Sequence, residues 1–327
     1  MPYTRSSQQH TSLPSAEFDA LVQAHDFYQG EAAAALKTID ELRAEIERLK
    51  APPTPVRPII TKDVIKNVMG VTLENSLTAP TDAQYEAMRV AMRQAAEMGF
   101  NAARWFLNAG EVKTHNALVD ANSPDHLPNY ARSLGLVYIA DTVDSVVWNT
   151  FKIENDPLKS GAQKASATSA LKVYLVGLER LGAAAFYLND ANQYRDAAKF
   201  PAGTLEKIAA RIRSITPNMP LIASLTANAA RGDYGAADHI EAQTFGTVSE
   251  LKAFLGRDFD VYCLDGRAKT VHVDYLQAMK DLLAARNPEA CFFYCDTVKD
   301  WQNAGMQEEL VIIRDIVQAW QAKRERP

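Results

Sequence analysis

Cysteine is scarce in this sequence: its 327 residues include only three, Cys263, Cys291 and Cys295. Because the three could lie near one another on neighbouring strands, a metal cluster is one interpretation. No CxxC pair or other recognised ligand spacing occurs, however. The spacing therefore favours small buried thiols in core strands.

Basic tracts and long apolar runs are also missing. Lys and Arg number 35 against 40 Asp and Glu, a formal net charge of −5, which argues against nucleic acid or an anionic membrane as the main partner. No apolar run approaches membrane-spanning length. The first residues, MPYTRSSQQHTSLPS, lack the apolar core of a signal peptide, so classical secretion is not expected.

The common catalytic motifs are absent as well. There is no HExxH or HxH cluster, which argues against a metal hydrolase, and we predict neither a metal site nor a cofactor. There is no GxSxG elbow, no P-loop and no GxGxxG, which argues against the commonest acyl-transfer and nucleotide chemistries.

What the sequence does contain is a ladder of eight short apolar runs, most of them followed by a stretch with helical periodicity. Eight strand–helix alternations predict an α/β fold, a (β/α)₈ TIM barrel over residues 59–327, with functional side chains at the carboxyl ends of the strands. The expected strands are 69–75, 101–108, 136–144, 184–192, 220–226, 239–246, 261–267 and 291–298. The expected helices are Thr81–Met98, Leu127–Leu134, Gly161–Leu181, Thr204–Ile215, Val248–Leu255, Val271–Ala285 and Gln307–Ala322.

The N-terminal part has a different organisation. Residues 1–15 form a polar arm, and apolar residues then recur at 3,4 spacing from Phe18 to Leu49. This narrow stripe predicts a coiled-coil oligomerisation helix over 16–50, with a single helix folded back on the barrel as the alternative. Four prolines within 51–58 predict a stiff linker to the barrel.

Three connections on the expected functional face are long: 109–126, 142–160 and 190–203. We expect them to form loops that act as lids or walls of a binding site. Their aromatic residues, and one just past the eighth strand, either cover the cleft or pack down as plugs: Trp148, Phe151, Tyr194, Phe200 and Trp301.

One segment carries a family resemblance. Residues 95–105, AAEMGFNAARW, resemble the second βα unit of clan A glycoside hydrolases, in which a Gly-Phe-Asn run leads into a strand whose arginine braces the nucleophilic carboxylate. GVTL at 70–73 and LGLVYIAD at 134–141 are similar to the family's first and third strands. The resemblance implies a polysaccharide or surface glycan as substrate.

The same resemblance implies roles for particular residues. Arg104 matches the bracing arginine, and Asn189 matches the sugar-contacting asparagine of the fourth strand. Asp190 stands where the family has its acid/base glutamate, and Asp265 where it has its nucleophilic glutamate. Trp301 lies slightly later than the family's tryptophan platform. The further predicted substrate contacts are Glu74, Glu241, Trp148 and Tyr194.

The two aspartates depart from the family pattern. Each is one methylene shorter than glutamate, so the gap between the carboxyl groups widens from about 5–5.5 Å toward the roughly 6.5–9.5 Å that admits a water molecule. The hypothesis is an inverting hydrolase in which Asp190 is the general acid and Asp265 activates water, and retention of configuration in the product would contradict it. Alternatively the barrel has lost the chemistry and binds glycans or fills a structural position, or its acids are paired with Arg104, Arg231 or Arg267.

A polar arm, an oligomeric stalk and a hydrolase-like head resemble the layout of phage tail-fibre proteins. This layout implies a homo-oligomer through residues 18–49 and contacts of the arm with other virion proteins. The expected location, cytoplasmic or virion-associated, follows from the lack of a signal-peptide pattern. Several identical heads would offset weak single-site affinity for a glycan.

Overall fold

The computed structural model describes residues 65–73, 82–107, 127–189, 191–226, 236–244, 246–254, 259–295, 301 and 305–324. All of them belong to the unit Ile59–Pro327. The predicted arm, coiled-coil helix and linker lie outside the described residues, as do Glu74 and Asp190. Within the described part of the chain, no helix is both long and apolar enough to cross a membrane.

Eight parallel strands close into a barrel in the order of the sequence, which confirms the predicted fold. The barrel closes where β1 pairs with β8. Their register runs from Val68 opposite Ala290 to Leu73 opposite Cys295. Near-continuous apolar runs suit these strands because both faces of the sheet are covered. The strands are β1 (Val68–Leu73), β2 (Ala102–Trp105), β3 (Val137–Ala140), β4 (Ala183–Leu188), β5 (Leu221–Thr226), β6 (His239–Gln243), β7 (Val261–Asp265) and β8 (Ala290–Cys295).

The two faces of the sheet contribute to two separate apolar clusters. The smaller cluster fills the barrel, with Ile139, Tyr187 and Phe292 among its members. The larger one packs the outer face of the strands against the helices. Gly70 makes room in the interior, since a Cβ there would lie 2.6 Å from the Phe292 ring. The barrel is thus a packed core rather than a pore.

The helices also follow the prediction closely. Helix α6 begins at a capping box, in which Ser160 and Gln163 each accept a hydrogen bond from the other's backbone N–H, an arrangement that fixes the start of a helix. The helical elements are α2 (Asp82–Glu97), α4 (Leu127–Ser133), α5 (Val143–Asn155), α6 (Gly161–Arg180), η2 (Ala191–Arg195, a 3₁₀ helix), α7 (Thr204–Ile215), α8 (Val248–Phe254), α9 (Val273–Arg286) and α11 (Gln307–Arg324).

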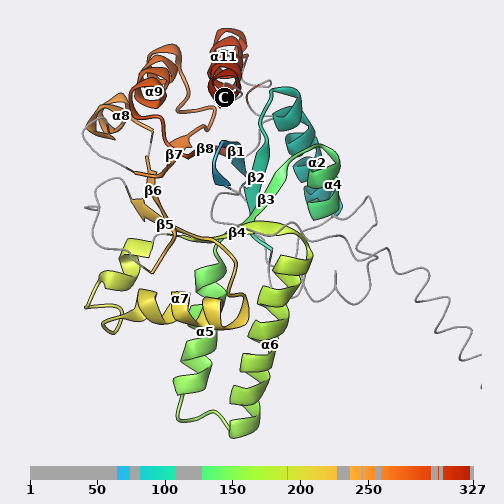
Figure 1. Ribbon diagram of the computed structural model, residues 1–327, viewed down its shortest axis with the longest axis vertical. Coiled ribbons are helices and arrows are strands. Elements are labelled where there is room, and N and C mark those ends of the chain that lie inside the picture. The colour runs from blue at the N-terminus through green and yellow to red at the C-terminus, as the bar shows by residue number, and fades with distance from the viewer. Residues whose placement is uncertain are drawn as a thin grey trace, which may run out of the picture. The chain divides into compact units, whose positions relative to one another are not determined.

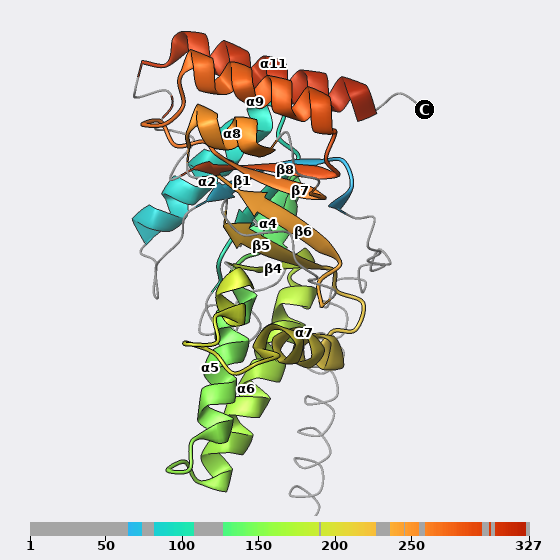
Figure 2. The same ribbon diagram turned by 90° about the vertical axis from the view of Figure 1, so that its left-hand side faces the viewer.

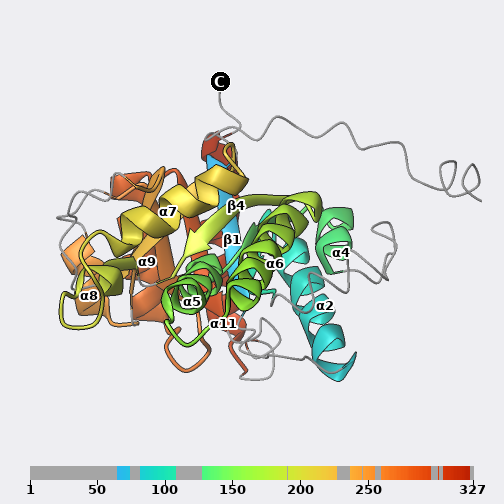
Figure 3. The same cartoon turned by 90° about the horizontal axis from the view of Figure 1, so that it is seen from below.

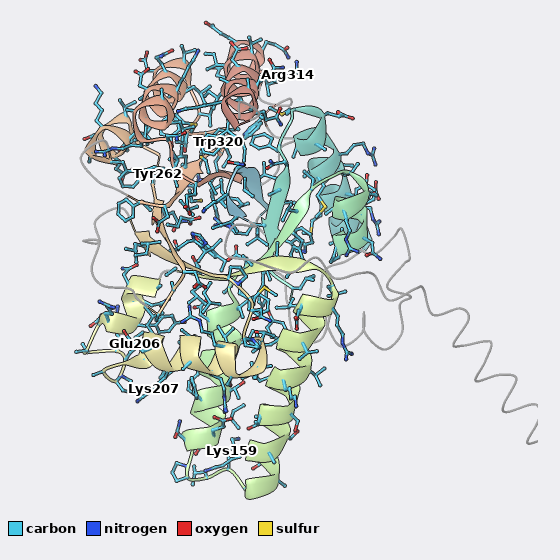
Figure 4. All side chains as sticks on the ribbon, in the orientation of Figure 1. Lys159, Glu206, Lys207, Tyr262, Arg314 and Trp320 are labelled. Carbon is cyan, nitrogen blue, oxygen red and sulfur yellow. The ribbon has the colours of Figure 1, made fainter. Side chains whose placement is uncertain are left out.

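One prediction was wrong. The connection 142–160 is not a long loop, because its residues Val143–Asn155 form helix α5. Helices α5 and α6 lie side by side and run away from the barrel, whereas α9 and α11 lie along its opposite side (Figures 1 and 2). Lys159 marks the turn between α5 and α6 (Figure 4).

A polar contact ties this helix pair to α7. Glu154 of α5 accepts hydrogen bonds from Thr168 of α6, at 2.7 Å, and from Arg211 of α7. Seen from below, α7 lies beside α5 (Figure 3). The 142–160 segment is therefore an ordered wall next to β4 and not a lid.

Candidate functional site

The centre of the barrel holds a buried ion pair. Arg104 of β2 is 1% exposed, and its Nη1 donates to Oε2 of Glu241 on β6 at 2.6 Å. Its Nη2 donates to Sγ of Cys263 at 3.1 Å. The guanidinium also lies over the rings of Tyr187, at 3.8 Å, and Phe292, at 4.6 Å, contacts that favour a desolvated cation.

Glu241 has both oxygens occupied. Oε1 accepts a hydrogen bond from the Tyr187 hydroxyl at 2.5 Å, and Oε2 is the partner of Arg104. Burial raises the pKa of Glu241, while the charge of Arg104 and the Tyr187 hydrogen bond oppose that rise. Burial likewise raises the pKa of Cys263 to about 12. Arg104, Tyr187, Glu241 and Cys263 thus form one polar network inside the barrel, in which Nε of Arg104 is buried without a hydrogen-bond partner among the described residues.

Asp265, at the end of β7, is held by its own loop. Its Oδ1 accepts from the Arg267 backbone N–H at 3.0 Å and from Arg267 Nε at 2.9 Å. Its Oδ2 accepts from Arg267 Nη2 at 2.5 Å and from the Thr270 hydroxyl at 3.2 Å. The carboxylate is 1% exposed. A fork of this kind neutralises a carboxylate at both oxygens and fixes its orientation.

The turn between β3 and α5 carries two more carboxylates. Asp141 is 14% exposed, and its Oδ2 lies 3.9 Å from Nε of Arg104. Thr142 follows in the left-handed region at φ 53° and donates its hydroxyl to Asp141 Oδ1 at 3.1 Å. Positive φ is rare for a β-branched residue and marks a strained, specific conformation.

Asp144, in the first turn of α5, is the second carboxylate. Its Oδ1 accepts the Asn189 backbone N–H at 2.9 Å, and its Oδ2 accepts the Tyr194 hydroxyl at 2.5 Å. Burial raises the pKa of Asp144 to about 7. Asp144 is not among the site residues predicted from the sequence. From the sequence, Asp144 was one of two acids, with Asp141, at the end of the third expected strand, and a salt bridge was the favoured role for such acids.

The aromatic candidates divide into two groups. Trp148, Tyr194 and Phe200 form one cluster, with ring centroids 5.2 Å apart for Trp148–Phe200 and 4.9 Å for Tyr194–Phe200. Trp301 is fully buried instead. Its Nε1 donates to the Gly266 carbonyl at 2.5 Å, and its ring packs near Phe100 and Phe293.

The structure therefore brings together two subsets of the predicted residues. Arg104 contacts Glu241, and Asp144 joins Asn189 to Tyr194. Arg104 reaches β7 at Cys263, two residues before Asp265, which Arg267 holds. Within the described ranges, no group of three or more His, Cys, Asp or Glu side chains has metal-binding geometry.

The sequence matches no family model and no curated protein, but the fold has known counterparts. It is similar to an exo-β-1,4-mannosidase from Opitutaceae bacterium strain TAV5 (11% identity, 78% of this chain and 60% of that one, TM-score 0.47). It is also similar to a β-1,4-D-mannanase from Cryptopygus antarcticus (11% identity, 75% of this chain and 90% of that one, TM-score 0.48). A third similar structure is the β-amylase catalytic domain from Paenibacillus polymyxa (9% identity, 76% of this chain and 97% of that one, TM-score 0.48).

These likenesses concern the barrel alone. The match spans only 60% of the length of the mannosidase. Because one barrel fold supports many chemistries, the likeness gives no role to individual residues of this chain.

The raised pKa of Asp144 gives a prediction for stability against pH. The folded state holds the Asp144 proton up to about pH 7, whereas the unfolded chain releases it near 3.9. Asp144 therefore contributes most to the free energy of unfolding below pH 4. This contribution falls as the pH rises from 4 to about 7, and it does not change further above pH 7. Asp144→Asn should remove this slope, and urea unfolding of both proteins at pH 5, 6, 7 and 8 measures it. An identical slope in the variant would contradict the assignment.

Proposed function

We propose that the barrel is carbohydrate-active in the sense of binding a saccharide at the carboxyl ends of its strands, without hydrolysing it through an Asp190–Asp265 pair. The state of Asp265 carries this proposal. A general base that activates water needs a free carboxylate oxygen directed at that water. Both oxygens of Asp265 accept hydrogen bonds from Arg267 instead, and the group is buried.

Two features support a saccharide as the ligand. The first is the resemblance of residues 95–105 to a glycoside hydrolase unit, together with Asn189 at the end of β4. The second is the cluster of Trp148, Tyr194 and Phe200, in which Trp148 and Phe200 are only partly buried. Aromatic rings beside polar side chains suit the mixed apolar and hydroxyl surfaces of a sugar.

Hydrolysis by a different pair is the competing function. Asp141, which follows β3, is a partly exposed carboxylate, and Asp190 follows β4 in the sequence, the strand that pairs with β3. In that case cleavage would depend on Asp190 and persist in Asp265→Asn.

Affinity electrophoresis and reducing-sugar release on the same polysaccharides separate these functions. The probes are galactomannan, xylan and carboxymethylcellulose, and the proteins are wild type, Asp190→Asn and Asp274→Asn, an exposed aspartate in the first turn of α9. We expect retarded migration in at least one gel and no sugar release. Release by wild type that is lost in Asp190→Asn and kept in Asp274→Asn would establish hydrolysis and overturn the proposal.

We further propose that residues 18–49 join several barrels into one particle, with the polar arm available to other virion proteins. The heptad spacing and the tail-fibre-like layout support this proposal. Light scattering on the full chain should give a multiple of 36.1 kDa, and removal of residues 1–58 should give a monomer. A monomeric full chain would contradict the stalk.

A further inference from the structure

Asp144 joins three elements through hydrogen bonds of one carboxylate, beside the ring contact of Trp148 on α5 with Tyr194 on η2. Its two carboxylate oxygens contact the backbone N–H that follows β4, at Asn189, and the Tyr194 hydroxyl of η2, while its own backbone belongs to α5. Asn189 and Tyr194 flank Asp190 in the sequence. The Asp144 carboxylate thus holds Asn189 and Tyr194 at the same time, in addition to the ring contacts of Tyr194 with Trp148 and Phe200.

The backbone that presents Asp144 is itself specialised. The left-handed Thr142 lies between Asp141 and Asp144, so the turn directs one carboxylate toward Arg104 and the other toward the end of β4. A non-glycine residue in that conformation persists only where the surrounding structure enforces it. Trp148 follows Asp144 by four residues on α5 and thus lies on the same side of the helix.

Among the described residues, Tyr194, Asn189 and Asp141 act on the Asp144 carboxyl group. The Tyr194 hydroxyl and the Asn189 amide donate to it and favour the ionised form, whereas burial and the charge of Asp141 favour the protonated form. An ionised carboxylate accepts both hydrogen bonds. A protonated one has a donor on one oxygen, so Tyr194 must turn its hydroxyl to accept and the contact with Asn189 weakens.

We infer that Asp144 is a positioning residue for Asn189 and for Tyr194 of η2, and that gain or loss of its proton changes how these two residues are held. The consequence for saccharide affinity rests on the function proposed above. The positioning itself does not, and it is measurable on the free protein.

Amide NMR of the full chain, without any saccharide, tests the inference. The Asn189 amide proton should shift with pH and show an inflection near pH 7, because its acceptor changes charge. Asp144→Asn keeps an oxygen acceptor but cannot titrate, so the inflection should disappear. Tyr194→Phe removes one donor to the carboxylate and should raise the inflection by about one pH unit. Asp274→Asn should leave it unchanged.

A flat Asn189 shift between pH 5 and 9 in wild type, or an inflection that persists in Asp144→Asn, would overturn the inference. If Asp144→Asn does not fold, an unmoved inflection in Tyr194→Phe has the same consequence. Affinity electrophoresis of wild type at pH 6 and pH 8 then tests the link to function. A barrel that binds none of the polysaccharides removes the proposed function, whereas the NMR titration still decides the role of Asp144.

Discussion

Replacement of Arg104 by methionine should lower the free energy of unfolding by about 3–5 kcal/mol, the cost of removing one partner of a buried ion pair. The arginine is the counter-ion of Glu241 in an interior with almost no exposure to solvent. Without it, Glu241 must either stay charged and unpaired or take up a proton. Urea unfolding at pH 7 measures the loss.

Two further variants show whether the ion pair causes this loss. Arg104→Met combined with Glu241→Leu removes both charges and should be less destabilised than Arg104→Met alone, because no unpaired charge remains. Arg314→Met, on the exposed face of α11 (Figure 4), should change stability by less than about 0.5 kcal/mol. Additive effects of the Arg104 and Glu241 substitutions would contradict the coupling.

Gly246→Ala should be the second large effect, a loss of about 2–5 kcal/mol in the free energy of unfolding. A Cβ at this position would lie 2.2 Å from Thr270 Cγ2 and 2.6 Å from Asp265 Oδ2, and the backbone has φ +98°. Overpacking costs about 1–3 kcal/mol, and the left-handed conformation adds roughly 1–2 kcal/mol. The close approach of this turn is part of what holds Asp265 in place.

Gly135→Ala is the matched control. This glycine also has positive φ, +76°, but a Cβ added there would meet nothing within 4 Å. The substitution should therefore cost only the roughly 1–2 kcal/mol of the left-handed backbone conformation. If Gly246→Ala and Gly135→Ala lowered the free energy of unfolding equally, steric contact with Thr270 and Asp265 would not contribute to the effect at Gly246.

The sequence predicts the barrel because its signal is local and repeated. Each strand is a short apolar run buried on both faces, and each helix has its own periodicity. The predicted limits of α7, 204–215, agree with the structure to the residue. Helix α5 was not predicted, although Val143, Val147 and Phe151 recur at helical spacing within it and Pro157 lies beyond its last residue, Asn155. The polar and charged residues between these positions are typical of a loop and obscured the short apolar pattern. The helix packs against α6, α7 and β4.

The site was harder to predict because its contacts join residues that are far apart in the sequence. Arg104 and Glu241 are 137 residues apart, and only closure of the barrel brings them together. The family resemblance implied that Arg104 braces the carboxylate at the end of β7, whereas its guanidinium donates to Glu241 and Cys263. The partner of Asp265 was easier to predict, because Arg267 is only two residues away in the sequence. Arg267 was one of the three arginines expected to pair with acids, and it binds Asp265. Of the two alternatives left open for Trp301, a cover over the cleft or a packed plug, the structure shows the plug, since the ring packs near Phe100 and Phe293.

Size analysis of a polysaccharide after incubation with the full chain tests the central claim most directly. Wild type and Asp265→Asn are each incubated with the polysaccharide that retards wild type most strongly, and the recovered chains are sized by gel filtration. We predict bound polysaccharide of unchanged length with both proteins, because Arg267 already occupies the Asp265 carboxylate. Shortening by wild type that Asp265→Asn abolishes would show Asp265 to be catalytic and would contradict the account.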